Sequence, residues 1–328
     1  MDRRRFVGAT MAGGALLSAA AQPQAPAQQF SEPGGGGPTA WGVEQVVVER
    51  KREGKPHRGK MLAAIQPHTD DIAIFAGGTV LKLIDEGYEG ILINLSNDEM
   101  AGSGASFGEV IANNERDTRE VARRLGLKDV EFLNYRNHLM DGAQILEMRA
   151  RLIFLFRLHK IDTVLVYDPS GLYERNPDHY VTAKAVEAAA WMCGSNWDYP
   201  EHFKAGLQPY AVKERYYFSR GPQLVNRVED ISDYMDRKAY VNVANVTQGP
   251  AGNTGSRLRR ELAARGKQLP LLGDDDETAD LQYAKHVALR RDREQGLRHG
   301  LEYAEYFHYI GPPLSYADQY VAENAVDL

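Results

Sequence analysis

The chain has 328 residues, of which 39 are Lys or Arg and 45 are Asp or Glu, so its formal net charge is −6. This acidic balance argues against a nucleic acid or an anionic membrane as partner, because both require a basic surface. The single cysteine, Cys193, excludes an intrachain disulfide and any CxxC metal or redox motif. The length of the chain is sufficient for one large α/β domain or two smaller ones.

Residues 1–21 resemble a twin-arginine export signal. The pair Arg3-Arg4 is followed by x-Phe-Val, a mild apolar stretch and the triplet Ala19-Ala20-Ala21, which fits an Ala-x-Ala cleavage site. The alternative is a short membrane anchor, but Val7 to Ala21 is too short and too rich in Gly and Ala to span a bilayer comfortably. We therefore expect a periplasmic or extracellular protein that has no membrane attachment after the signal is cleaved.

The segment 22–42 is rich in Pro, Gln and Gly and has no periodicity, which predicts a flexible linker. The rest of the chain, 43–328, is predicted to be one domain with a core at 60–195 and a C-terminal strand and helix extension at 196–328. Its first stretch, 43–49, suits an edge strand or a helix.

From Lys60 onward, short apolar runs alternate with amphipathic segments. The apolar runs predict strands at 61–65, 90–95, 130–133 and 163–167, and the amphipathic segments predict helices at 77–87, 109–125, 144–159 and 179–192. This rhythm is typical of βαβ units and indicates an α/β fold with a mostly parallel sheet and helices on both faces.

Beyond residue 195 the pattern is weaker. We expect strands at 214–219 and 240–243, a surface loop over the Gly-rich and charged stretch 248–280, and a long charged helix over 281–306 that covers the sheet edge. The aromatic residues near its end are assigned to core packing rather than to a carbohydrate platform; they are Tyr303, Tyr306, Phe307 and Tyr309.

Two turns that follow predicted strands carry the chemistry. His68, Asp70 and Asp71 come directly after the first strand, and Asp178-His179 follows the strand at 163–167. In open α/β folds, ligands bind beyond the carboxyl ends of the strands, where such turns can converge. One imidazole and two carboxylates within four residues form a costly charge cluster that a divalent cation would relieve.

A site made of His68, Asp71 and His179 would leave one position open for water, as catalytic zinc sites require. Zinc would lower the pKa of that water towards neutrality. Asp70 could accept the water's proton and later pass it to a leaving amine. Asp178 could accept the other ring N–H of a metal-binding histidine and so fix its tautomer.

Simpler interpretations exist for each motif. The acid pair Asp70-Asp71 alone is more often an N-cap or a solvated turn, and His179 alone could be a capping or core histidine. Gly77-Gly78 could suggest a dinucleotide loop, but the third glycine of that fingerprint is missing and the nearby acids would repel a pyrophosphate. The occurrence of both motifs, each after a strand, favours the metal site.

The two motifs together resemble the PIG-L/LmbE family of zinc-dependent N-acetylglucosamine deacetylases. That family carries His-Pro-Asp-Asp-Glu early and His-Pro-Asp-His later on a Rossmann-like sheet, and the resemblance covers residues 60–195. It implies one zinc ion per chain held by His68, Asp71 and His179, with Asp70 as general base. It also implies hydrolysis of an N-acyl amide on a small-molecule or glycan substrate.

The chain departs from the family's two motifs at three positions. Thr69 replaces the usual proline and Ile72 the usual glutamate, and Asn176 stands where the family has a histidine that helps to stabilise the oxyanion. Asn176 can still donate one hydrogen bond to the oxyanion, and Tyr173 or the metal could supply the rest of the stabilisation.

Substrate contacts are expected from loops that leave the same sheet edge. The family's substrate-side arginine falls at Asn114 by counting, so nearby Arg116 is a candidate. The full set of predicted substrate residues is Asp98, Arg116, His138 and Tyr173.

The sequence thus predicts an exported amidohydrolase acting on an amino sugar or a glycoconjugate. The alternatives are a metal-dependent hydrolase of a non-sugar amide and a non-catalytic glycan-binding protein on the same scaffold.

Overall fold

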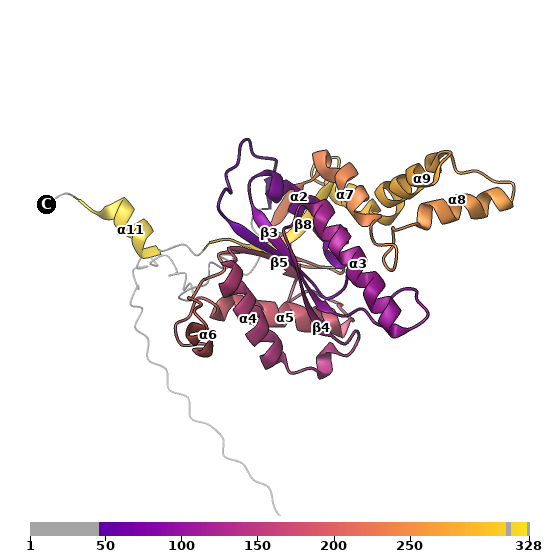
Figure 1. Ribbon diagram of the computed structural model, residues 1–328. Helices are drawn as coiled ribbons and strands as arrows, with labels where there is room; N and C mark the ends of the chain where they lie inside the picture. The colour runs from indigo at the N-terminus through magenta and orange to yellow at the C-terminus, as the bar shows by residue number, and fades with distance from the viewer. Residues whose placement is uncertain (1–45, 313–315, 327–328) are drawn as a thin grey trace, which may run out of the picture.

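The computed structural model describes residues 46–312 and 316–326, so the predicted signal at 1–21 and the predicted linker at 22–42 lie outside the described residues. One sheet of eight strands runs through the molecule in the order β1-β7-β8-β6-β5-β2-β3-β4 (Figure 1). All neighbouring strands are parallel except β8, which is antiparallel to β6 and β7. The strands are β1 (Val47–Glu49), β2 (Met61–Gln66), β3 (Glu89–Ser96), β4 (Val130–Tyr135), β5 (Thr163–Tyr167), β6 (Glu214–Phe218), β7 (Arg227–Asp230) and β8 (Ala304–Ile310).

Helices cover both faces of the sheet, as the alternating pattern predicts. In Figure 1, α4 and α5 lie below the sheet, and α2, α3 and α7 lie above it. The α-helices are α1 (Asp71–Phe75), α2 (Gly77–Asp85), α3 (Phe107–Leu125), α4 (Ile145–His159), α5 (Pro177–Met192), α6 (Glu201–Lys204), α7 (Met235–Asn242), α8 (Thr254–Ala264), α9 (Asp276–Tyr283), α10 (Arg290–Leu297) and α11 (Tyr316–Asn324). No helix among the described residues combines the length and apolar character needed to cross a bilayer.

The hydrophobic core has two layers, one on each face of the sheet. Leu62 of β2 belongs to the layer that includes Val80 of α2 and Val121 of α3, whereas its neighbour Ala63 belongs to the layer that includes Leu152 of α4 and Val186 of α5. Because successive strand residues point to opposite faces, the unbroken apolar run of β2 supplies both layers.

Local signals set the ends of α3. The Ser106 side chain accepts a hydrogen bond from Glu109 N at 3.2 Å, and Glu109 Oε2 accepts one from Ala105 N at 2.8 Å, in the manner of a capping box. At the other end, Gly126 adopts a left-handed conformation with φ of 78°. Glycine takes this conformation without steric cost, so it ends the helix.

Three expectations for the C-terminal part are wrong. The predicted strand at 240–243 is the end of α7, whose buried residues Met235, Lys238, Ala239 and Asn242 recur at helical spacing. The predicted loop at 248–280 contains α8 and the start of α9, which project from the body of the molecule in Figure 1.

The predicted long helix at 281–306 is interrupted. A π-helical turn, Ala284–Ala288, separates α9 from α10, and the chain then turns at Gly300, with φ of 69°, into β8. Tyr303, just before β8, and Phe307 within it are 2% and 0% exposed, so the expected core role of these two aromatic residues is confirmed. The segment therefore inserts between β6 and β7 rather than covering an edge.

A buried ionic network attaches this strand to the start of α2. Glu305 accepts hydrogen bonds from Gly78 N at 2.9 Å and Thr79 N at 2.7 Å, and it pairs with Lys238 at 2.7 Å. Lys238 also pairs with Asp292 at 2.5 Å. The carboxylate of Glu305 thus meets the positive end of a helix and a buried ammonium group, which compensates for its desolvation.

We expect the substitution Glu305→Ala to lower the free energy of unfolding by about 3–5 kcal/mol, because it leaves two buried N–H groups without an acceptor and Lys238 with only one of its two carboxylate partners. Urea denaturation followed by circular dichroism measures this change. The control Glu302→Ala removes a carboxylate that is 62% exposed, and its effect should stay within about 0.5 kcal/mol. Equal losses in the two variants would contradict the role of the network.

Candidate metal centre

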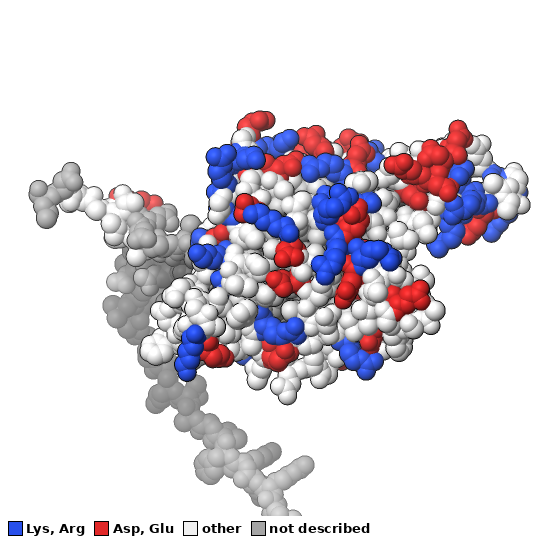
Figure 2. Space-filling view, viewed as in Figure 1, with Lys and Arg blue, Asp and Glu red and all other residues white. Residues whose placement is uncertain are grey.

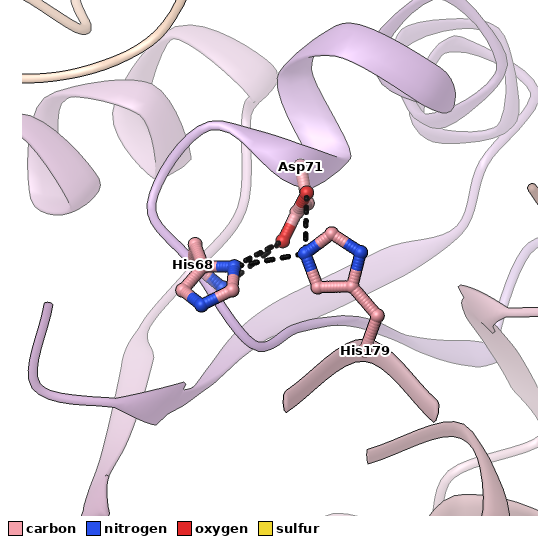
Figure 3. A group of neighbouring side chains, drawn as sticks. All are labelled: His68, Asp71 and His179. Atoms are coloured by element: carbon pink, nitrogen blue, oxygen red, sulfur yellow. Dashed lines mark hydrogen bonds and ion pairs between the residues drawn. The ribbon is translucent and has the colours of Figure 1, made fainter. Parts of the chain in front are cut away.

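Three predicted ligand residues meet at the carboxyl ends of β2 and β5, which are neighbouring parallel strands. His68 lies two residues after β2, Asp71 begins α1, and His179 is the third residue of α5. One donor atom from each residue lies within 4.8 Å of the others, and Figure 3 shows the three side chains pointing toward one another. All three residues are buried, with exposures of 6% or less.

The donor atoms converge closely. His68 Nδ1 lies 3.0 Å from His179 Nε2 and 3.4 Å from Asp71 Oδ2, and His179 Nε2 lies 3.7 Å from Asp71 Oδ1. Two imidazole nitrogens and one carboxylate form a donor set that zinc commonly takes in proteins, with a fourth position left for solvent. The residues therefore fit a divalent metal ion.

The turn that carries His68 is held by its own polar groups. His68 N donates to Asp71 Oδ2 at 3.0 Å, and Asp71 N donates to His68 O at 3.2 Å. Thr69 N donates to Asp98 Oδ2 at 3.2 Å, and its hydroxyl lies 2.9 Å from the same atom. A proline at position 69 would lack this N–H, so the departure from the family pattern adds a bond that anchors the turn.

The two acidic residues of the turn differ in their surroundings. Burial opposes the ionisation of Asp71, but the imidazoles of His179 and His68 and the Tyr167 hydroxyl, which donates at 2.6 Å, lower its pKa to about 2. Burial and the neighbouring charge of Asp71 raise the pKa of Asp70 to about 7. The Asp70 carboxylate is partly exposed and forms no hydrogen bond or ion pair with another described residue.

A second carboxylate supports His68. Asp178 is fully buried, and its Oδ2 lies 3.0 Å from His68 Nε2 and accepts a hydrogen bond from His138 N at 2.7 Å. Its Oδ1 accepts one from Met140 N at 3.2 Å. A carboxylate at Nε2 favours a proton on that nitrogen, which leaves Nδ1 as the lone-pair donor that faces His179 and Asp71.

Asn176 has a structural task in addition to any catalytic one. Its Oδ1 accepts a hydrogen bond from Asp178 N at 3.0 Å and so caps α5, and Pro177 occupies the first helical position. Of the two polar atoms in its amide, Nδ2 is the one left to donate elsewhere.

The four predicted substrate residues divide into two groups. His138 and Tyr173 are exposed, and the His138 ring lies 6.1 Å from the His68 ring, at the edge of the centre. Asp98 is 1% exposed and accepts hydrogen bonds from the Thr69 amide and hydroxyl, so in this structure it holds the turn that carries His68. Arg116 lies on the exposed face of α3, where it interacts with Asn113 and Asp117, and no described contact joins it to the centre. Basic and acidic side chains are interspersed over this helix in Figure 2.

Three residues at the centre were absent from the sequence prediction. Glu174 lies 3.2 Å from His179 Nδ1, Tyr167 donates to Asp71, and Gly249 packs against Asp70. A β-carbon added to Gly249 would lie 3.1 Å from Asp70 Oδ2. Glu174 was detectable as an acid shortly before the Asn-Pro-Asp-His motif, whereas nothing in the local sequence links Gly249 to Asp70.

Comparison with known proteins places this centre in context. The sequence profile of the family described as PIG-L, GlcNAc-PI de-N-acetylase, matches residues 63–190, which include both turns. The chain is 30% identical over 198 residues to the diacetylchitobiose deacetylase of Thermococcus kodakarensis, and the match covers 58% of this chain and 71% of that protein.

Solved structures extend the comparison. The N,N'-diacetylchitobiose deacetylase of Pyrococcus horikoshii is similar with a TM-score of 0.61 at 25% identity, over 77% of this chain and 84% of that chain. GalB, the 4-carboxy-2-hydroxymuconate hydratase of Pseudomonas putida, is similar with a TM-score of 0.56 at 17% identity, over 78% of this chain and 98% of that chain. At that identity, the likeness to GalB concerns the fold alone.

We expect the substitution His179→Ala to abolish equimolar metal binding, because it removes one of three convergent donors. Plasma emission spectrometry of protein dialysed against zinc measures the metal content. The control His286→Ala removes an exposed histidine and should bind as much metal as the parent protein. Retention of one tightly bound ion by the His179→Ala protein would contradict the assignment.

Proposed function

Because the chain belongs to the PIG-L/LmbE family of deacetylases, we propose that it is a zinc-dependent hydrolase that removes an acyl group, in particular acetyl, from an amino sugar or a glycoconjugate. The observation that carries this proposal is the convergence of His68, Asp71 and His179 beside the unpaired carboxylate of Asp70. Metal-assisted amide hydrolysis requires such a combination of a cation site and an adjacent proton acceptor.

The ligand residues and Asp70 have separate tasks. His68, Asp71 and His179 would hold the zinc ion, which when bound supplies a Lewis acid for water and for the acyl carbonyl. Asp70 would accept a proton from the attacking water at a carboxylate oxygen and return it to the amine nitrogen as the C–N bond breaks.

Packing around Asp70 supports this task. Gly249 packs against the Asp70 side chain and the charge of Asp71 acts on its carboxyl group, while the residue remains partly exposed. The same surroundings raise the pKa of Asp70 to about 7, so its carboxylate can both accept and return a proton near neutral pH.

Substrate recognition is the finer part of the proposal. We assign His138 and Tyr173 to substrate contact, because both rings are exposed on loops that lead to the centre. Two of the similar proteins, from Thermococcus kodakarensis and Pyrococcus horikoshii, are diacetylchitobiose deacetylases, which supports an N-acetylated sugar as the substrate class.

We expect Asp70→Asn to lower kcat by about 10²–10⁴-fold while metal content stays at one ion per chain, because the amide cannot accept the proton. Acetate release from a panel of N-acetylated amino sugars measures the rate. The control Asp233→Asn changes an exposed aspartate and should leave turnover unaltered. Undiminished turnover of every substrate by the Asp70→Asn protein would contradict the mechanism.

The same assay separates the alternative functions. A purified parent protein that releases carboxylate only from non-sugar amides would replace the amino-sugar proposal by a broader amidohydrolase. Bound metal with no turnover of any amide, together with measurable glycan binding, would favour the binding protein.

We further propose that residues 1–21 direct export by the twin-arginine route. Replacing Arg3 and Arg4 together by Lys should retain the uncleaved protein in the cytoplasm, because the pair is the feature that this route reads. Immunoblots of cell fractions measure its distribution. The single change Arg5→Lys lies between that pair and Phe6, and it should leave export intact. Unchanged export of the double variant would contradict the proposal.

A further inference from the structure

Glu174 contacts the ring nitrogen of His179 that does not face the other ligands. Its Oε2 lies 3.2 Å from Nδ1, without the alignment of a linear hydrogen bond, whereas His179 Nε2 faces His68 and Asp71. A carboxylate beside Nδ1 favours a proton on that nitrogen and leaves the lone pair of Nε2 directed at the centre.

Arg220 holds this carboxylate through two nitrogens of its guanidinium group. Arg220 Nη2 lies 2.5 Å from Glu174 Oε1, and its Nε lies 3.1 Å from Oε2. Asn176 N also donates to Oε1 at 2.9 Å. A two-point contact of this kind fixes the plane of a carboxylate as well as its position.

The loops that carry these two residues are fastened to one another. They follow β5 and β6, which are neighbouring parallel strands. Leu172 N donates to Pro222 O at 3.0 Å, and a β-carbon added to Gly221 would lie 2.3 Å from Leu172 O. Arg220 and Gly221, which lie outside the matched range 63–190, therefore help to fix the position of Glu174.

The two histidines are supported in parallel ways through opposite nitrogens. Asp178 faces His68 at Nε2 and leaves Nδ1 directed inward, and Glu174 faces His179 at Nδ1 and leaves Nε2 directed inward. From these contacts we propose that Glu174 and Arg220 form a positioning pair that fixes the ring of His179 and thereby sets the affinity of the centre for its metal ion. This inference rests on the proposed metal site and deepens the proposed function.

The first test measures metal affinity without substrate. Zinc binding is titrated by competition with a chromophoric chelator for the parent, Glu174→Ala and Arg220→Met proteins. We expect Glu174→Ala to weaken zinc binding by about 10–100-fold, and Arg220→Met by a smaller factor, because Glu174 remains but can rotate.

The matched control is Arg237→Met. Arg237 is 47% exposed and pairs with Asp85 at 2.6 Å, whereas Arg220 is 45% exposed, so both changes remove a half-exposed ion-paired arginine. We expect the control to bind zinc as the parent does. Equal affinities for the parent, Glu174→Ala and Arg220→Met proteins would overturn the proposal.

The second test measures the tautomer of the His179 ring directly. In ¹⁵N-detected spectra of histidine-labelled protein without metal, the parent should show His179 with its proton on Nδ1, and Glu174→Ala should show a mixture of tautomers. The conservative variant Glu174→Gln keeps an oxygen that can accept from Nδ1, so it should retain the parent tautomer and lose less affinity. If Glu174→Ala does not fold, the zinc affinities of Glu174→Gln and Arg220→Met take its place, and parent-like affinity in both variants would overturn the proposal.

Failure of this inference is distinguishable from failure of the proposed function. A parent protein that binds zinc but hydrolyses no amide refutes the function, while weaker zinc binding by Glu174→Ala still supports the positioning pair. An active parent whose Glu174→Ala form binds zinc with full affinity and keeps one tautomer supports the function and refutes the pair.

Discussion

The centre depends on keeping two imidazole rings and an aspartate together while they are almost completely buried. Buried ionisable groups are costly unless each has a partner, and here each has one. Asp178 holds His68, Glu174 lies beside His179, and Tyr167 donates to Asp71. The supporting carboxylates are stabilised in turn by backbone N–H groups and by Arg220, so the charge is balanced outward from the ligands to the surface.

The topology of the sheet makes this arrangement possible. β2, β5 and β6 lie side by side and run parallel, so the loops after their carboxyl ends share one edge. The first loop supplies His68, Asp70 and Asp71, the second supplies Glu174 and leads into His179, and the third supplies Arg220. The later segment that contains Gly249 then packs on Asp70. The site is therefore completed by residues far beyond the two motifs that define it.

The strength of the local pattern decided which parts of the fold could be predicted. β2 and β5 are short apolar runs bounded by polar turns, and α3 has a serine cap and a terminal glycine, so their predicted bounds agree with the structure within one or two residues. The prediction of a strand around Tyr240 was wrong because the β-branched residues there suggest one. The helix α7 instead buries Lys238 against Asp292 and Asn242 against the Ala73 carbonyl, and these partners lie elsewhere in the chain. The prediction of one continuous helix before β8 was wrong because the charged sequence gives no sign of the π-helical turn that separates α9 from α10.

The sequence by itself determined which residues form the candidate metal centre. It contained the residue types, their spacing and their places after strands, because a metal ligand must be a particular side chain and a turn after a buried strand can be recognised locally. Only the tertiary structure decided which groups surround those ligands. That Asp98 is buried, that Arg116 faces solvent, and that Arg220 holds Glu174 beside His179 are results of how the loops pack. Packing partners that are far apart along a chain cannot be recognised from either segment alone.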